Sequence, residues 1–187
     1  MLRGAILVSL LLFGSSSWAA PQPMAEFQVG SSDGISGFGP VVPVFAVEAG
    51  GGLRIRSFYL VVEAASQFAG ASWCTNIADG PCLSLFVVHE GALELGVLIQ
   101  TPSLVTVNIG AKATVGVWDS MIYQKPPDFT WSAGPTFGFA ISRPGHPSLK
   151  IEFTPRIRAI RGYGPDNVFW FESQVLIGVA APPLSRL

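Results

Sequence analysis

Residues 104–118 read LVTVNIGAKATVGVW, and apolar and polar side chains alternate through the stretch. Successive side chains of a β-strand point to opposite faces, so the stretch predicts a strand with one apolar and one polar face. The apolar face would carry Val105, Val107, Ile109, Ala111, Ala113, Val115 and Val117. The polar face would carry Thr106, Asn108, Gly110, Lys112, Thr114 and Gly116. This strand is longer than the usual globular strand of about 5 to 6 residues.

The composition is too apolar for an ordinary soluble domain. The chain has 187 residues, of which 12% are charged, and its mean hydropathy is +0.47. Soluble domains carry about 25% charged residues. After the first 19 residues, no apolar run approaches the roughly 20 residues that a membrane-spanning helix needs. Because lipid cannot hydrogen-bond the backbone, the remaining way to span a membrane is a closed β-barrel.

The first 19 residues predict a cleaved signal peptide. Arg3 supplies the positive charge, residues 5–13 form a short apolar segment, and Ser17 and Ala19 are small residues at positions −3 and −1 of a cleavage site after Ala19. The mature domain would therefore be residues 20–187. It keeps ten basic and twelve acidic residues, a net charge of −2, which argues against a nucleic-acid partner.

Clusters of Gly, Pro, Ser and Asp divide the rest of the chain into eight expected strands. These are residues 23–31, 40–50, 53–66, 84–100, 103–118, 129–142, 149–161 and 167–180. An even number of antiparallel strands is typical of bacterial membrane barrels. The sequence therefore predicts an all-β fold, an eight-stranded antiparallel up-and-down transmembrane β-barrel.

The expected connections alternate in length. The second, fourth and sixth are short, and comprise Gly51-Gly52, Thr101-Pro102 and Arg143 to Ser148. The first, third, fifth and seventh are mostly longer, and comprise Ser32 to Gly39, Gln67 to Leu83, Asp119 to Asp128 and Gly162 to Asp166. Membrane barrels have short periplasmic turns and longer outer loops, so the longer set would face outward.

The polar faces favour a membrane barrel over a soluble sandwich, which would bury its apolar faces. They consist mostly of Gly, Thr, Ser and Ala with few charges, whereas a soluble surface needs more Lys and Glu. Aromatic residues gather near strand ends, as in the aromatic girdles of membrane barrels. They are Trp73, Trp118, Phe129, Trp131, Phe169 and Trp170.

The expected third strand does not follow the pattern. Arg54 and Arg56 have one parity, and Tyr59 and Glu63 have the other. A bulge near Ser57 would resolve the conflict. Placing both arginines at the periplasmic headgroups, where long basic side chains reach the polar region, would also resolve it, and we favour this second arrangement.

Charged residues recur on the polar, inward-facing parity. The expected set is Glu26, Glu48, Glu90, Glu94, Lys112, Lys150, Glu152, Arg156, Arg158 and Glu172, together with Glu63. They could form an ion path or a salt-bridged plug. We favour the plug, because an eight-stranded barrel is only wide enough for its own side chains and buried charges need partners. Glu172 would pair with Arg156 or Arg158.

Cys74 and Cys82 flank a short segment in the longest expected outer loop. In an exported protein, two closely spaced cysteines predict a disulfide. The sequence offers neither a third cysteine nor a nearby histidine for a metal, and we expect no cofactor.

Two histidines allow an enzymatic alternative. His146 is followed by Ser148, with Glu152 as a third member, but this group would lie at the periplasmic end and Pro147 would disturb the strand. His89 has lipid-facing parity near the outer end of its strand, where Ser57 or Ser66 on the neighbouring strand could partner it. We find no Gly-x-Ser-x-Gly elbow, phosphate loop, zinc pattern or EF-hand in the sequence.

The leader, the eight alternating strands, the cysteine-bearing loop and the closing strand 171–179 (FESQVLIGV) resemble small bacterial outer-membrane β-barrel proteins of the OmpA and OmpX type. The resemblance covers the mature chain and implies a non-enzymatic, porin-like barrel that stabilises the envelope, adheres or makes surface contacts. Its partners would be outer-membrane lipid, the barrel-assembly machinery and an unidentified surface partner. The alternatives are a lipid A acyltransferase or deacylase and a soluble secreted ligand-binding β-protein.

Overall fold

A computed structural model describes most of the chain. The described residues are 20–36, 39–72, 83–101, 104–120, 128–143, 146–161 and 168–181. They form eight β-strands: β1 (Gln22–Ser36), β2 (Gly39–Ile55), β3 (Phe58–Ser72), β4 (Leu83–Gln100), β5 (Val105–Ser120), β6 (Asp128–Ile141), β7 (Ser148–Arg161) and β8 (Val168–Ala181). Within these ranges there is no helix long and apolar enough to cross a membrane.

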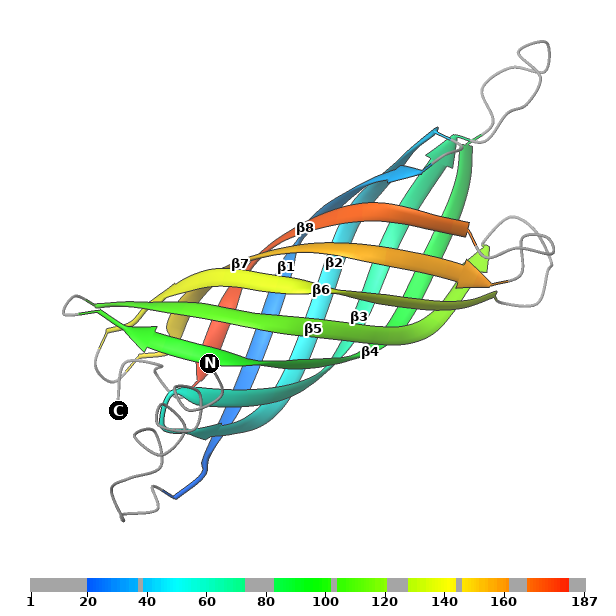
Figure 1. The fold of residues 1–187 in the computed structure, drawn as a ribbon. Helices are drawn as coiled ribbons and strands as arrows, with labels where there is room; N and C mark the ends of the chain where they lie inside the picture. The colour runs from blue at the N-terminus through cyan, green and yellow to red at the C-terminus, as the bar shows by residue number, and fades with distance from the viewer. Residues whose placement is uncertain are drawn as a thin grey trace, which may run out of the picture.

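The strands close into a single antiparallel barrel in sequence order (Figure 1). Each strand pairs with the next, and β1 pairs with β8 from Ala25↔Ala181 to Ser36↔Trp170. This arrangement confirms the predicted eight-stranded up-and-down barrel. β1 starts and β8 ends at the same end, which we call the terminal end. The opposite end, where β3 leads toward β4, is the distal end.

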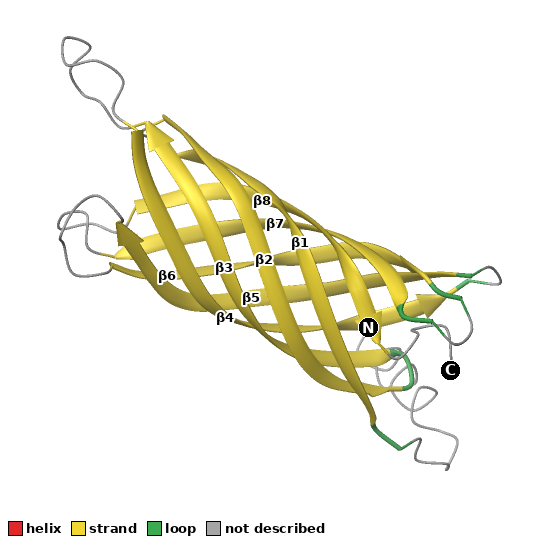
Figure 2. Cartoon of the chain, turned by 180° about the vertical axis from the view of Figure 1, so that it is seen from behind, coloured by secondary structure: helices red, strands yellow, loops and turns green. Residues whose placement is uncertain are grey.

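The strands are long and strongly tilted (Figure 2). The shortest have 14 residues and the longest has 18. At about 3.3 Å per residue and a tilt of about 40°, the shortest strands rise roughly 35 Å along the barrel axis. This rise exceeds the apolar band of about 25 Å that membrane barrels expose to lipid.

The second connection lies five residues later than predicted, at Arg56-Ser57. Gly51 and Gly52 are within β2, where Gly51 pairs with both Ala25 and Val62. A Cβ on Gly52 would lie 2.0 Å from the Leu60 carbonyl oxygen, so this glycine permits close strand contact and does not form a turn. The turn uses Arg56, whose φ of 55° is in the left-handed region.

This correction removes the parity conflict of the third strand. Arg54 is on β2 and pairs with Tyr59 of β3 across the turn. Arg54 is 3% exposed inside the barrel, and its Nε donates to the Arg56 carbonyl oxygen at 3.0 Å. The parity of this region therefore needs no bulge near Ser57. The headgroup position that we favoured for Arg54 and Arg56 is also not needed, and it is wrong for Arg54.

Two distal connections are shorter than the sequence suggested. β1 continues to Ser36 and β2 starts at Gly39, so most of residues 32–39 are strand. β3 likewise continues to Ser72. Glycine, serine and aspartate at 30–36 resemble a loop by composition, but these residues pair with β8, and a register shift between Gly30 and Gly34 adjusts their pairing with β2.

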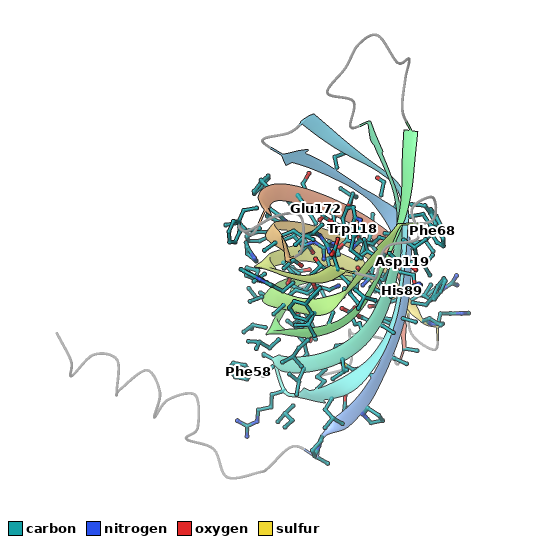
Figure 3. All side chains as sticks on the ribbon, turned by 90° about the vertical axis from the view of Figure 1, so that its right-hand side faces the viewer. Phe58, Phe68, His89, Trp118, Asp119 and Glu172 are labelled. Atoms are coloured by element: carbon teal, nitrogen blue, oxygen red, sulfur yellow. The ribbon has the colours of Figure 1, made fainter. Side chains whose placement is uncertain are left out.

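The two faces of the wall have opposite polarity. Large apolar side chains lie outside, with exposed fractions near one half for residues such as Ile109, Phe137 and Ile177. The inside is polar, and the largest fully buried side chains are those of Arg156 and Arg158. In Figure 3, Glu172 lies within the ring of strands, while Phe58 and Phe68 lie outside it. A soluble protein has the reverse arrangement.

Candidate functional site: the charged lumen

Charged side chains from seven strands meet in the lumen, the space inside the barrel. Strand alternation places them there: the inward positions are odd-numbered on β3, which carries Glu63, and even-numbered on the other six strands. They form two groups. The arginine cluster consists of Glu90, Arg156, Arg158 and Glu172. The lysine cluster consists of Glu26, Glu48, Glu63, Glu94, Lys112, Lys150 and Glu152.

The arginine cluster lies toward the distal end and is centred on Glu172. One carboxylate oxygen of Glu172 accepts hydrogen bonds from Arg156 Nε at 3.2 Å and Nη2 at 2.6 Å. The other oxygen accepts from Arg158 Nε at 2.5 Å. Ser32 Oγ also donates to Glu172, at 2.8 Å. Glu172 is therefore an anion that both guanidinium groups share.

Glu90 completes the arginine cluster from the other side of the lumen. It accepts hydrogen bonds from Arg158 Nη1 and from Arg158 Nη2, the latter at 3.0 Å. Arg156 Nη1 lies 3.9 Å from Glu90, and Thr114 Oγ1 donates to Glu90 at 2.9 Å. Two guanidinium groups therefore face two carboxylates, and the cluster is electrically balanced.

Lys112 of β5 gathers carboxylates from three other strands. Its Nζ contacts Glu48, lies 2.6 Å from Glu63 Oε2 and is 3.7 Å from Glu152 Oε1. Gln174 Nε2 donates to the second oxygen of Glu48 at 2.9 Å. These side chains come from β2, β3, β5, β7 and β8, so the contacts hold distant parts of the wall together.

Lys150 of β7 forms the second centre of the lysine cluster. Its Nζ is 2.7 Å from Glu152 Oε2, 3.0 Å from Glu26 Oε2 and 3.8 Å from Glu94 Oε2. Tyr59 Oη donates to Glu94 Oε1 at 2.5 Å. Five carboxylates thus share two ammonium groups, so the lysine cluster carries a surplus of negative charge.

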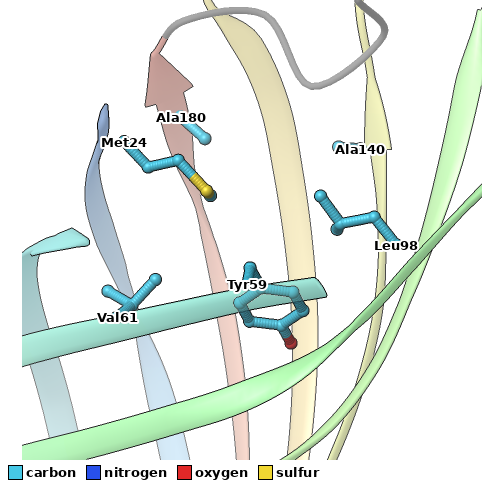
Figure 4. Packing of buried hydrophobic residues seen from close by; sticks show 6 residues of the cluster. All are labelled: Met24, Tyr59, Val61, Leu98, Ala140 and Ala180. Carbon is cyan, nitrogen blue, oxygen red and sulfur yellow. The ribbon is translucent and has the colours of Figure 1, made fainter. Parts of the chain in front are cut away.

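An apolar layer lies beside the lysine cluster at the terminal end. Figure 4 shows its members, which are Met24, Tyr59, Val61, Leu98, Ala140 and Ala180. Each is at most 7% exposed. This layer was not predicted from the sequence, although its residues share the inward parity of the charged side chains. Together with the two clusters, the layer fills much of the lumen's length.

All eleven charged residues assigned to the inward face lie in the lumen and are at most 6% exposed. Glu172 contacts both Arg156 and Arg158, which were its two candidate partners. Arg54 is an additional buried charge that the sequence analysis did not assign to the lumen.

A polar pair lies on the outer wall. Ser66 of β3 and His89 of β4 are register partners, and Ser66 Oγ is 3.0 Å from His89 Nδ1. Asp119 of β5 is exposed on the same wall and pairs with Val87, two residues from His89 (Figure 3). Among the described residues, no hydrogen bond or ion pair joins Asp119 to His89. The Ser66–His89 pair therefore resembles a catalytic serine–histidine dyad and not a complete serine–histidine–aspartate triad.

The second histidine group is not assembled. His146 is exposed, whereas Ser148 is buried and its Oγ is 2.5 Å from Ser142 Oγ. Glu152 is 2.7 Å from Lys150 in the lysine cluster. The predicted disulfide of Cys74 and Cys82 lies outside the described residues, as does the predicted signal peptide, residues 1–19.

The aromatic girdle is present in part. Trp131 and Phe169 lie on the outer wall with ring centroids 6.1 Å apart in an edge-to-face arrangement. Trp131 and Phe169 are the register partners of Ala159 on the two neighbouring strands, and Ala159 between them is 1% exposed. Trp118 was assigned to the girdle, but it points into the lumen and is 4% exposed. Its even position gives it the parity of Thr114 and Lys112, which explains the error.

A closed eight-stranded wall with an apolar outside and a charged inside is the architecture of small outer-membrane β-barrels. Neisserial surface protein A (NspA) has a similar fold, with a TM-score of 0.64 and 13% sequence identity over 87% of this chain and 98% of that chain. No family model and no curated protein match the sequence.

Two structures of Ail, the attachment invasion locus protein of Yersinia pestis, align less well. The complex with the heparin analogue sucrose octasulfate has a TM-score of 0.44 and 12% identity, over 85% of this chain and 99% of that chain. The other structure has a TM-score of 0.42 and 12% identity, over 84% of this chain and 97% of that chain. At these identities, the likeness to the Neisserial protein shows the fold alone.

Proposed function

We propose that this protein is a non-enzymatic β-barrel of the bacterial outer membrane. The observation that carries the proposal is the inverted polarity of the wall: arginines are its largest buried side chains, and large apolar residues cover its outside. A surface of this kind is stable in lipid and aggregates in water. After assembly by the barrel-assembly machinery, the distal connections after β3, β5 and β7 would then present the surface that contacts other molecules.

The lumen acts in this proposal as a structural plug. Its charged side chains are nearly inaccessible to water, and their ion pairs join strands on opposite sides of the barrel. An eight-stranded barrel has no room for an aqueous channel once its side chains are in place. We therefore expect no measurable conductance when the purified protein is inserted into a planar bilayer. A steady ion current would contradict the plug.

Membrane fractionation tests the proposed location. The protein should sediment with outer membranes, remain there after a carbonate wash and dissolve only in detergent, because its outer wall replaces contacts with water by contacts with lipid. Recovery in the soluble periplasmic or secreted fraction would contradict the proposal. It would instead favour the soluble ligand-binding alternative.

The Ser66–His89 pair favours one second candidate, a lipid A-modifying enzyme. A serine activated by a neighbouring histidine can attack an acyl ester, and the pair faces the region where lipid would lie. If this candidate is correct, His89→Ala and Ser66→Ala should each abolish a change in lipid A that the wild type produces, as measured by mass spectrometry. His146→Ala, which changes an exposed histidine at the terminal end, is the matched control. Identical lipid A with and without the wild-type protein would exclude the candidate.

A further inference from the structure

We infer that the lumen holds a divalent cation, for which Ca²⁺ is the best fit, between Glu26, Glu63 and Glu94. One carboxylate oxygen from each residue lies within 4.8 Å of the other two. The three side chains come from β1, β3 and β4, so the site exists only in the closed barrel. The inference concerns the interior and is independent of the proposed function.

The charges of the lysine cluster do not balance. The arginine cluster pairs two guanidinium groups with two carboxylates, whereas the lysine cluster pairs two ammonium groups with five carboxylates. Three negative charges are left over in a region that water barely reaches. A buried charge without compensation is strongly unfavourable, so the lysine cluster needs additional positive charge.

Buried carboxylate oxygens without hydrogen-bond donors lie in this cluster. Glu63 Oε1 and Glu94 Oε2 have no hydrogen-bond partner, and both side chains are fully inaccessible. In Glu94, Tyr59 and Thr136 both donate to Oε1, which leaves Oε2 open. In Glu63, the Lys112 contact is at Oε2, which leaves Oε1 open. Glu63 Oε1 can thus bind a cation, and Glu94 Oε2 has the Lys150 ammonium group at 3.8 Å but no hydrogen-bond donor.

The dry surroundings favour Ca²⁺ over Mg²⁺. Ca²⁺ binds oxygen ligands at about 2.3–2.6 Å, so two ligands on opposite sides of the ion are about 4.6–5.2 Å apart. Three oxygens that lie within 4.8 Å of one another can therefore share one such ion. Mg²⁺ usually keeps several water ligands, and water barely reaches these side chains.

A neutral ligand is also at hand. Gln28 is fully buried and its Oε1 has no hydrogen-bond partner, while its Nε2 is 3.4 Å from Glu26 Oε1. An amide oxygen is a common Ca²⁺ ligand and would add no further charge. Lys112 and Lys150 would remain paired with Glu48 and Glu152. Each lysine also contacts a ligand of the site, since Lys112 Nζ lies 2.6 Å from Glu63 Oε2 and Lys150 Nζ lies 3.0 Å from Glu26 Oε2.

The test is refolding of the mature full-length chain into detergent with CaCl₂ or with a chelator, followed by dialysis and measurement of bound calcium. We expect one Ca²⁺ per folded chain and a higher unfolding temperature with Ca²⁺ than with the chelator. Tb³⁺ in place of Ca²⁺ should luminesce on excitation of tyrosine, because Tyr59 contacts Glu94. This luminescence needs no variant and should fall when Ca²⁺ is added.

Two variants separate a cation site from a purely structural cluster. Glu63→Gln should lose the bound calcium, and its unfolding temperature should no longer respond to Ca²⁺. Glu90→Gln alters a buried glutamate of the arginine cluster and should keep the calcium response, whatever its basal stability. The inference is overturned if the folded wild type retains no Ca²⁺ and shows no Tb³⁺ luminescence, since the surplus charge would then be neutralised by protons. It is also overturned if Glu63→Gln retains the ion.

Discussion

Replacement of Glu172 by glutamine tests the lumen network most severely. The substitution keeps the size of the side chain and removes the carboxylate that accepts hydrogen bonds from Arg156 at 2.6 Å, from Arg158 at 2.5 Å and from Ser32 at 2.8 Å. Glu90 would then be the remaining anion for two guanidinium groups, and one positive charge would be left uncompensated in a site that is 4% accessible.

The expected loss follows from that imbalance. Removal of one partner of a buried ion pair costs about 3–5 kcal/mol of unfolding free energy. Since each 1.4 kcal/mol is about a tenfold change in an equilibrium constant, the folded-to-unfolded ratio should fall by a factor of at least about 100. Urea titration of the barrel in lipid vesicles measures this loss when the folded fraction is read from its faster gel mobility without boiling.

Two controls accompany this experiment. Asp119→Asn is the same chemical change on the exposed outer wall, and it should alter stability by no more than about 0.5 kcal/mol. The double variant Arg156→Gln/Glu172→Gln restores the balance between Arg158 and Glu90, so it should be more stable than the sum of the single losses implies. A neutral Glu172→Gln would refute the reasoning, because it would mean that water reaches the lumen and solvates the arginines.

Three further changes test other parts of the structure. Ile109→Arg places a charge on the lipid side of β5, where Ile109 is 45% exposed, and should lower the unfolding free energy by about 2–4 kcal/mol in the same urea titration. Normal assembly of this variant would show that the faces are wrongly assigned. Gly116→Ala should lower the unfolding free energy by about 1–3 kcal/mol, because its Cβ would lie 2.0 Å from the His89 carbonyl oxygen. Gly91→Ala should leave the unfolding free energy unchanged, because no atom lies within 4 Å of its Cβ position, and equal effects of the two variants would contradict the strand packing. Cys74 and Cys82 should show no free thiol until reduction, which should lower stability by about 2–3 kcal/mol in the chain-entropy model; reaction of both thiols without reductant would exclude the disulfide.

The faces of the strands were predictable because strand geometry has a period of two residues. Once residues 104–118 are recognised as a strand, the side of each residue follows from whether its number is odd or even. The same rule applied to Trp118 would have placed it inside, but its position near a strand end suggested a girdle residue. Local alternation was the better guide than residue type at this position.

The turn at Arg56-Ser57 was not predictable from composition. Glycine is used both in turns and where neighbouring strands approach closely, and the sequence does not distinguish these uses. Gly50 and Gly52 serve the second use, since a Cβ would lie 2.8 Å from the Val62 carbonyl oxygen at Gly50 and 2.0 Å from the Leu60 carbonyl oxygen at Gly52. The parity conflict between Arg54 and Tyr59 was the signal that a turn lies between them.

The pairings inside the lumen depend on closure of the barrel. Glu172 and Arg156 are register partners on adjacent strands, so sequence alone suggested their contact. Arg158 of β7 and Glu90 of β4 meet across the lumen, as do Lys112 of β5 and Glu48 of β2. These contacts are set by strand tilt and register, which a single sequence does not specify. Ser66 and Ser57 were both possible partners of His89, and register selects Ser66.

The most direct test of the central claim compares two tryptophans on opposite faces of the wall. Trp131 is 39% exposed outside, whereas Trp118 is 4% exposed inside. In vesicles of brominated lipid, a variant that retains only Trp131 should lose most of its fluorescence, and one that retains only Trp118 should not, because bromine quenches by contact. Strong quenching of Trp118 together with protection of Trp131 would show that the wall faces the opposite way and that the membrane-barrel account is wrong.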